Sequence, residues 1–391
     1  MPGRCVPAQR MTGDAAGPTE SVPSTCTSRV AVLLLLLAAV QFVVFIGYFP
    51  SSIIVTPYGD VLDWLSGFYE IAQQNLWQYL PAPHNGHRIV FTKLLTVADA
   101  RLFAGLGYPV AWVCLSLLLA LATLVTCAIW RSVDDAIVRR WAIAVAILLL
   151  FPTSLYPNVA YPVNSQHVIV IFFAMMACGS LTCSAAADGA RLRRLYSGVC
   201  VAAACCASLA SLNGMLVWPI LLWMAWSLRL GRSTSVVIVL VGVFVIVRFG
   251  VSSSVATETG SSIAALGDIA HATRYLIEFH AMPWIEVDSL YWPAMCIGLP
   301  LLLLSVFFCL QAFVSPHGMR PITVVAIAML MFSLATAIVI ALGRHKMNLS
   351  PAHRYGIFLV VSCVALFVLV LPVFERWMAN ARTMRVVLGL T

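Results

Sequence analysis

The chain has 391 residues, of which 61% are hydrophobic and 10% charged, with a mean hydropathy of +0.96. An ordinary soluble domain is excluded, because its apolar share is about 45–50%. The formal net charge of +8 does not indicate nucleic-acid binding, since the basic residues are spread over alternate connections between apolar segments.

Apolar segments long enough for membrane helices recur along the whole chain. A bilayer core needs about 20 apolar residues per helix, and no long polar stretch is left over for a soluble domain. We therefore predict an all-α fold, a polytopic transmembrane helix bundle of about ten spans with amphipathic helices on its outer face. The spans are expected at roughly 30–49, 109–130, 141–157, 167–185, 197–212, 214–228, 234–252, 291–314, 322–343 and 355–374.

The basic residues predict the orientation. They follow the second, fourth, sixth and eighth spans, whereas residues 51–87 contain no Lys or Arg. By the positive-inside rule both termini are cytoplasmic and that first loop is outside, in a multi-pass protein of the plasma (inner) membrane. Residues 1–28 are expected to be a disordered cytoplasmic tail, residues 29–375 the transmembrane domain, and residues 376–391 a second cytoplasmic tail.

The first outer loop, about residues 51–108, begins with acidic side chains. Apolar residues recur at helical spacing over 61–74, which predicts an amphipathic helix lying along the interface. Asp60 precedes this helix and Asp63 lies in its first turn. Carboxylates at a membrane edge are costly unless solvated or paired, so both are candidate catalytic residues. The alternatives are a helix cap for Asp60 and a solvated interfacial loop for the whole cluster.

The same loop continues into a turn that carries two histidines. Residues 83–88 read Pro-His-Asn-Gly-His-Arg, and their Pro, Asn and Gly content predicts a turn. His84, His87 and Arg88 are therefore expected to lie together. The following stretch, 88–105, is too polar for a free span and is predicted to be a second surface helix.

Two further connections carry amide side chains. Asn164 and Gln166 lie in the outer turn before the fourth span, where amides suit sugar hydroxyls, although ordinary turn chemistry is the stronger explanation. Residues 195–228 must cross the membrane twice, so we expect two short helices with a turn at 211–214. A turn below the bilayer surface needs protein or a water-filled cavity around it, which places Asn213 near the floor of an outward-facing cavity.

The late outer loops are predicted at about 252–290 and 344–354. The first contains a helix over about 262–280, in which Arg274 and Glu278 have the i, i+4 spacing of an ion pair. The second breaks the positive-inside pattern, which indicates an anionic ligand or, alternatively, contact with outer-leaflet phosphates. Its candidate phosphate-binding residues are Arg344, Lys346, Arg354 and Tyr355.

The placement of these motifs resembles the GT-C glycosyltransferases, the superfamily of aminoarabinose transferases and protein O-mannosyltransferases. Asp60 stands where these enzymes keep an acid before an amphipathic helix, and residues 83–88 stand in place of a His-Pro-Pro-type turn. Residues 102–105 (Leu-Phe-Ala-Gly) resemble the end of the family's second surface helix. Residues 212–214 resemble its later Asn-Gly turn, and residues 354–355 its Arg-Tyr pair.

The resemblance implies transfer of a sugar from a polyprenyl-phosphate donor to a glycan, lipid or protein acceptor at the outer face. It implies a carboxylate that activates the acceptor, with Asp60 as first choice and Asp63 as second, and arginines that hold the leaving phosphate. These arginines would be Arg88, Arg344 and Arg354. His84 and His87 would assist the leaving group.

Two other functions stay open at this point. One is a flippase or transporter of a lipid-linked saccharide, which would need polar groups near the midplane of several helices. The other is a polysaccharide polymerase or ligase. No cofactor and no metal site are predicted, because a histidine pair alone is a weak metal signal; a divalent metal held by His84 and His87, with Asp60 as a third ligand, is the alternative. The expected partners are the donor, the acceptor and membrane lipids, and no nucleic acid.

Overall fold

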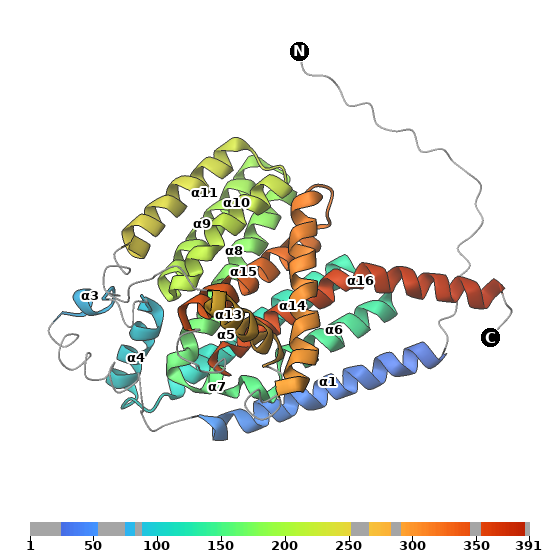
Figure 1. The fold of residues 1–391 in the computed structure, drawn as a ribbon, viewed down its shortest axis with the longest axis horizontal. Helices are drawn as coiled ribbons and strands as arrows, with labels where there is room; N and C mark the ends of the chain where they lie inside the picture. Colours follow the sequence, from blue (N-terminus) through green and yellow to red (C-terminus); the bar gives the residue numbers. More distant parts are fainter. Residues whose placement is uncertain are drawn as a thin grey trace, which may run out of the picture.

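Helices build the whole of the chain that the computed structural model describes, which comprises residues 25–53, 75–82, 88–251, 266–282, 291–344 and 353–387 (Figure 1). No strand occurs within these ranges. The long helices are α1 (Thr25–Ser52), α5 (Tyr108–Ser132), α6 (Ala136–Leu150), α8 (Ser165–Ala186), α9 (Ala190–Ala210), α10 (Val217–Ser227), α11 (Arg232–Val245), α14 (Tyr291–Val314), α15 (Pro321–Arg344) and α16 (Gly356–Val387). The remaining elements are α3 (Leu76–Tyr79), α4 (Val90–Leu102), α7 (Tyr156–Ala160), α13 (Leu266–Ala281) and the short turns η2 (Thr153–Leu155), η3 (Pro162–Asn164), η4 (Leu212–Leu216), η5 (Ile246–Val251) and η7 (His353–Tyr355).

The chain is a multi-pass helical membrane protein. Each of the ten predicted segments contains a helix, and eight helices among the described residues are long and apolar enough to cross a membrane. The pair formed by α6 and Thr153–Ala160, bent by 44°, would be a ninth span. The bend follows Pro152, which lacks the N–H that would continue the helix. The count of ten spans stays a prediction.

The hairpin formed by α9 and α10 differs from the prediction in one respect. Its turn lies where expected, since α9 ends at Ala210 and η4 follows. Only α10 is short, however, with 11 residues, whereas α9 has 21 and meets the length and hydropathy of a span. The prediction of two short helices was wrong because α9 begins at Ala190, within the arginine-rich connection that was assigned to the loop.

Gly214 allows the hairpin to close. A Cβ built at this position would overlap the main-chain carbonyl of Ala207 in α9. We expect Gly214→Ala to lower the free energy of unfolding by about 1–3 kcal/mol, because backbone cannot move aside as a flexible side chain can.

Gly179 in α8 provides the matched control, because a Cβ there meets no atom within 4 Å. Gly179→Ala should be neutral or stabilising by up to about 1 kcal/mol, the difference in helix propensity. Thermal unfolding of both variants in detergent measures the two effects. Equal melting temperatures for the two variants would contradict the packing of η4 on α9.

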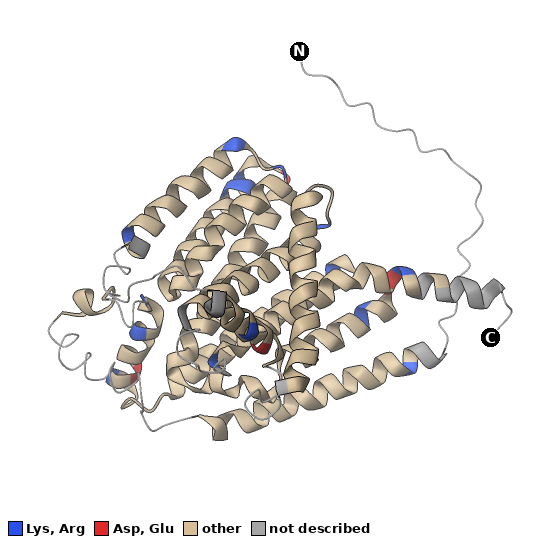
Figure 2. Ribbon diagram, viewed as in Figure 1, with Lys and Arg blue, Asp and Glu red and all other residues tan. Residues whose placement is uncertain are grey.

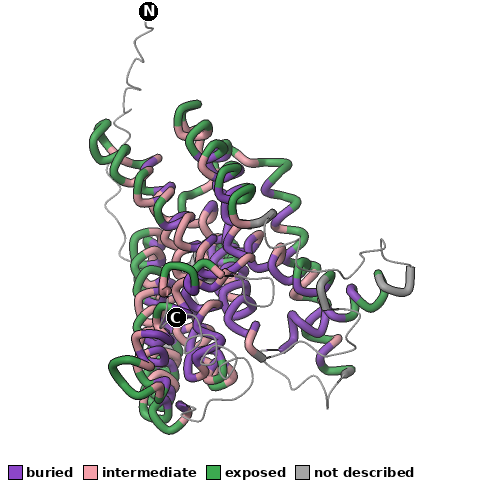
Figure 3. The backbone as a smooth tube through the Cα atoms, turned by 90° about the vertical axis from the view of Figure 1, so that its left-hand side faces the viewer, coloured by how far each residue is buried: buried purple, intermediate pink, exposed green. Residues whose placement is uncertain are grey.

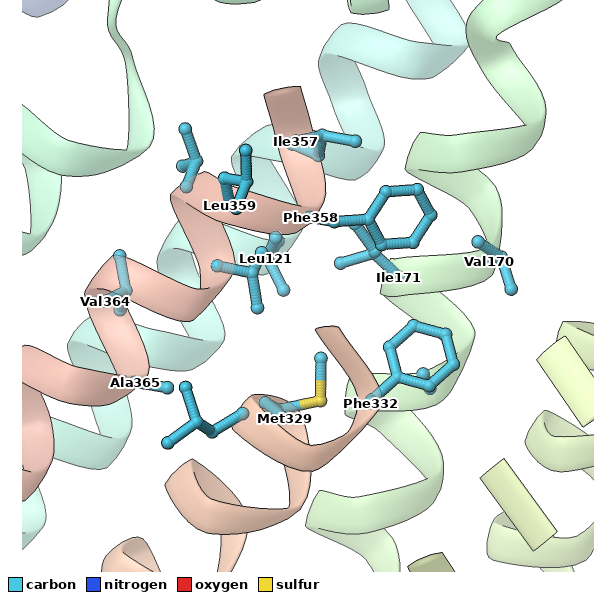
Figure 4. Close-up of a cluster of buried hydrophobic side chains, with 14 of the residues drawn as sticks. Leu121, Val170, Ile171, Met329, Phe332, Ile357, Phe358, Leu359, Val364 and Ala365 are labelled. Carbon is cyan, nitrogen blue, oxygen red and sulfur yellow. The ribbon is translucent and has the colours of Figure 1, made fainter. Parts of the chain in front are cut away.

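The core lies where α5, α8, α15 and α16 meet. Figure 4 shows Leu121, Val170, Phe332 and Phe358, one from each of these helices, and all four are at most 3% exposed. The rings of Phe332 and Phe358 lie 6.1 Å apart. Burial is concentrated in the middle of the bundle, while α11 and α1 keep exposed residues along their length (Figure 3). Because lipid is as apolar as these side chains, close packing holds the helices together, more than removal of apolar surface from water.

Charged side chains gather at the two ends of the bundle (Figure 2). The connections α5–α6, α8–α9, α10–α11 and α14–α15 and the second half of α16 belong to one end, here the basic end. Arg320 of the α14–α15 connection pairs with Glu375 of α16 at 3.4 Å, and Nδ1 of His317 lies 3.3 Å from the Ser227 carbonyl oxygen before α11. The opposite end, here the loop end, is formed by α4, α7, α13 and η7.

We expect the basic end to face the cytoplasm, because it collects the arginines that the positive-inside rule concerns. In a variant without native cysteines, a membrane-impermeant thiol reagent added outside should label Ser66→Cys and spare Ser132→Cys. Ser132 ends α5 at the basic end, and Ser66 belongs to the first loop, outside the described residues. Labelling of Ser132→Cys alone would reverse the orientation.

Candidate functional site

The loop end brings together polar segments that lie far apart in the sequence, between residue 88 and residue 355. The predicted second surface helix is present as α4, which packs against α5, α8 and α9. The turn η7 packs against α7 and η2, and η4 packs against η5. Two groups of side chains with chemistry of interest result, one around the start of α4 and one around η7.

Several predicted site residues lie outside the described residues. These are Asp60, Asp63, His84, His87 and Lys346, together with the side chain of Arg344. Their assignment as catalytic or phosphate-binding residues stays a prediction.

Three cations form the first group, here the cation cluster: Arg88, Lys93 and Arg248. The guanidinium carbons of Arg88 and Arg248 lie 5.4 and 5.8 Å from the centroid of the same ring, that of Phe249. Burial, and after it the charge of Arg248, lowers the pKa of the Arg88 guanidinium. Two residues 160 positions apart in the sequence therefore place like charges within electrostatic reach of each other.

Lys93 is the buried member of the cation cluster. Its side chain is 3% exposed, and its Nζ donates to the carbonyl oxygens of Tyr79 at 3.0 Å and Ala82 at 2.7 Å. The ammonium also lies 4.6 Å from the centroid of the Tyr79 ring. Burial and the charge of Arg88 lower the pKa of Lys93 to about 8. Nη1 of Arg88 donates to the Pro81 carbonyl oxygen at 2.8 Å, so Lys93 and Arg88 together hold the backbone of residues 79–82.

The backbone that carries Arg248 and Phe249 is unusual. Residues Ile246–Val251 form a π-helical turn that continues α11. Such turns are rare and occur frequently at functional sites, because the extra residue per turn re-aims the side chains. Here the π turn places one cation and one aromatic ring opposite the start of α4.

The second group surrounds η7. Tyr355 is 6% exposed, and its ring lies 5.1 Å from that of His167 and 6.3 Å from that of Phe279. His167 also contacts Phe358, at 5.5 Å between ring centroids. The guanidinium of Arg354 lies 5.3 Å from the Tyr355 ring centroid, and its buried Nε has no hydrogen-bond partner among the described residues. Arg354 thus combines an aromatic support with an unused donor.

The predicted amide residues lie between the two groups. Asn164 is buried and its Nδ2 donates to the Pro157 carbonyl oxygen at 2.6 Å, while Nε2 of Gln166 donates to the Val163 carbonyl oxygen at 3.3 Å. Beside them, the hydroxyls of Thr92 and Ser165 lie 3.0 Å apart and link α4 to the start of α8. These contacts of the two amides are those of ordinary turn chemistry, the explanation favoured from the sequence.

Asn213 lies in the turn between α9 and α10. It is 6% exposed and belongs to η4, which packs against the π turn. The cavity expected above it stays a prediction.

Two acids near the loop end are structural. Oδ2 of Asp99 accepts a hydrogen bond from the Gly107 N–H at 2.8 Å and so closes the turn between α4 and α5. Burial raises the pKa of this carboxyl, and the hydrogen bond from Gly107 opposes the shift. On α13, the predicted pair is confirmed, with Nε of Arg274 2.7 Å from Oε1 of Glu278.

His280 follows this pair on α13. It is 3% exposed, and its Nδ1 lies 2.7 Å from the Leu276 carbonyl oxygen. Burial lowers the pKa of His280. No group of three His, Cys, Asp or Glu side chains that could hold a metal ion occurs in the described ranges.

Sequence reasoning missed the cation cluster as a unit. Of its three members, only Arg88 was among the predicted site residues. A local signal exists for Arg248, since it ends an apolar run of about 15 residues with an arginine, which is costly in lipid unless it serves a purpose. Nothing local indicates that Arg88 lies beside it.

No family model, curated protein or solved structure matches this chain. The function is therefore argued from the residues and their geometry.

Proposed function

We propose that this protein is a membrane glycosyltransferase of the GT-C type, which moves a sugar from a polyprenyl-phosphate-linked donor to an acceptor at the outer membrane face. The observation that carries the proposal is that charged residues lie at the ends of the helix bundle and not in its interior. Charged residues within the eight spans lie only near their ends, for example Arg131, Arg248 and Glu375. The buried polar side chains of the interior are neutral, among them Thr182, Ser208, Ser305, Ser333, Thr336 and Ser362.

This distribution supports chemistry at one face more than passage through the bundle. A transporter of a charged, lipid-linked saccharide needs polar groups at the midplane. The hydroxyls of Thr182, Ser208 and Ser305 instead donate to carbonyl oxygens four residues earlier in their own helices, at 2.7–3.0 Å. A phosphate-bearing donor at the loop end would meet Arg354 on η7 and Arg88 on the other side of the start of α8.

The proposed roles follow from the chemistry of transfer. The donor's carbon–oxygen bond to phosphate breaks as the acceptor hydroxyl attacks, so negative charge grows on the leaving phosphate and a proton leaves the hydroxyl. Arg354 and Arg344 are assigned to the phosphate, because a guanidinium fork matches two phosphate oxygens. Asp60 is assigned to the proton. Tyr355 orients Arg354 through the ring contact at 5.3 Å.

The test is to reconstitute the full chain in liposomes with radiolabelled polyprenyl-phosphate sugars and a cell-envelope extract as acceptor. We expect the donor to be consumed and free polyprenyl phosphate to accumulate, detected by chromatography and mass spectrometry. If the lipid-linked saccharide instead moved to the other leaflet with its sugar–phosphate bond intact, the protein would be a transporter and not a transferase.

A further inference from the structure

Trp130 and Arg139 form a contact at the basic end, between the last turn of α5 and the first turn of α6. The guanidinium carbon of Arg139 lies 4.3 Å from the centroid of the Trp130 ring. Trp130 is 57% exposed, so this pair lies at the surface of the bundle. A ring beneath a guanidinium fixes the plane of the group and leaves the N–H donors at its edge for a ligand.

Arg139 makes no ion pair with the part of the chain that the structure describes. The acid nearest to it along the helix, Asp135, caps α6 and accepts hydrogen bonds at its Oδ1 from two N–H groups of the first turn, both at 2.9 Å. Asp134, the other acid of this connection, is exposed. On α16, Glu375 is paired with Arg320. The guanidinium of Arg139 is therefore held by a ring, and its charge can serve an anion from outside the chain.

Arg29 of α1 lies at the same level as Arg139. Nε2 of Gln41 donates to the carbonyl oxygens of Leu148 and Phe151, at 2.9 and 3.0 Å, which aligns α1 with α6. The two helices run in the same direction from the basic end (Figure 1). Arg29 precedes Gln41 by twelve residues, and Arg139 precedes Phe151 by twelve. Because both helices rise equally per residue, the two arginines lie at one height.

Arg376 of α16 lies on the same side of the basic end. The ring of Trp141 in α6 lies 5.9 Å from that of Phe374, which is 5.9 Å from the ring of Trp377. Helix α6 packs against both α1 and α16, and Figure 2 shows basic residues towards the ends of all three helices. Three helices thus contribute arginines to one part of the surface.

The surroundings of these arginines are those of a membrane surface. Trp130 and Trp377 are 57% and 62% exposed, and tryptophan is enriched at head-group depth. Further along α1, Leu33 and Leu36 are 56% and 59% exposed and face lipid chains. An anion bound here would have its charge beside guanidinium groups and its apolar part along α1. A phospholipid with an anionic head group combines these two features, whereas a free phosphate has only the first.

We propose that Arg139, supported by Trp130, binds the head-group phosphate of an anionic phospholipid, with Arg29 and Arg376 as flanking charges. The site lies at the opposite end of the bundle from the loop end, so it is independent of the proposed transfer reaction. It differs from the general attraction of arginines to an anionic membrane, because it requires one particular aromatic ring.

The test uses the full chain, purified in an uncharged detergent and titrated with phosphatidylglycerol or phosphatidylcholine in native mass spectrometry. We expect the first phosphatidylglycerol to bind roughly tenfold more tightly than phosphatidylcholine, the difference expected of one charge-assisted contact. Arg139→Gln should remove this preference. Arg191→Gln, which removes the same charge from an exposed arginine at the start of α9, is the matched control and should keep it.

The ring is tested separately from the charge. Trp130→Leu keeps every arginine and should weaken phosphatidylglycerol binding by about two- to fivefold, the range expected for loss of an exposed cation–π contact. Trp226→Leu is the matched control, since Trp226 is also half exposed at the basic end but contacts His317 instead, at 5.4 Å. Arg139→Lys, which keeps the charge without a planar group, should be weakened like Trp130→Leu.

Binding is compared among variants that keep the wild-type melting temperature, and Arg139→Lys replaces Trp130→Leu if the latter does not. Wild-type affinity in both of these variants would overturn the role of the ring. Equal losses in Arg139→Gln and Arg191→Gln would overturn the site in favour of nonspecific attraction to the basic end.

Two further outcomes concern the ligand. Equal affinities of the wild-type chain for phosphatidylglycerol and phosphatidylcholine would overturn the anionic head group. Glycerophosphoglycerol, the head group without its acyl chains, separates a lipid from a soluble phosphate. If it bound as tightly as phosphatidylglycerol, the lipid would be overturned as the ligand.

Discussion

Asp60→Asn should lower turnover by about 10²–10⁴-fold, the range of general-base contributions, while donor binding is largely kept. Asn caps a helix about as well as Asp, so the substitution removes the negative charge and retains the cap hydrogen bond. If Asp60 were only a cap, the variant would behave like the wild type. The measurement is steady-state transfer in liposomes together with donor titration. Residue 60 lies outside the described residues, and its expected role follows from the chemistry of sugar transfer.

Asp63→Asn is the control for this prediction. Asp63 lies in the first turn of the same predicted helix and carries the same charge, but it does not occupy the N-cap position. If the Asp63→Asn variant were inactive and the Asp60→Asn variant active, Asp63 would be the general base. Full activity in both variants would indicate that the first outer loop has only a structural role. The transporter would then be the favoured function.

Arg354→Ala should weaken donor binding by roughly ten- to hundredfold, which corresponds to the loss of one charge-assisted hydrogen-bonded contact of about 1.5–3 kcal/mol. The side chain is supported by the Tyr355 ring at 5.3 Å and its buried Nε has no acceptor among the described residues. Arg354→Lys should also be impaired, because a point charge cannot reproduce the fork. Titration with a polyprenyl-phosphate donor, on variants with wild-type melting temperature, measures both effects.

Arg320→Ala is the matched control at the basic end. Arg320 is also near a helix end and forms an ion pair at 3.4 Å with Glu375 in the second half of α16, whereas η7 directly precedes the start of that helix. Its loss should leave donor affinity unchanged. Equal effects of the two substitutions would indicate nonspecific attraction to phosphate, and wild-type affinity in Arg354→Ala would remove this arginine from the site.

The local features of the fold were predictable from the sequence. Hydropathy located the apolar helices, and turn residues located the break at 211–214, because a chain in lipid must satisfy its backbone hydrogen bonds within each segment. The surface helix α4 was predictable from the polarity of residues 88–105, and the Arg274–Glu278 pair from the i, i+4 spacing of the two residues. The boundaries were less certain, as the arginine-rich start of α9 shows.

Only the tertiary structure decided which side chains share a place at the loop end. Arg88 and Arg248 meet at Phe249, Tyr355 lies against His167, and the Thr92 and Ser165 hydroxyls lie 3.0 Å apart, all between segments distant in sequence. Such pairings depend on which helices pack together and on the rotation of each helix about its axis. The hydropathy pattern of the sequence determines neither of these. The π turn after α11 is a clear case, because one extra residue in a helical turn re-aims Arg248 without changing the apolar pattern that predicts the helix.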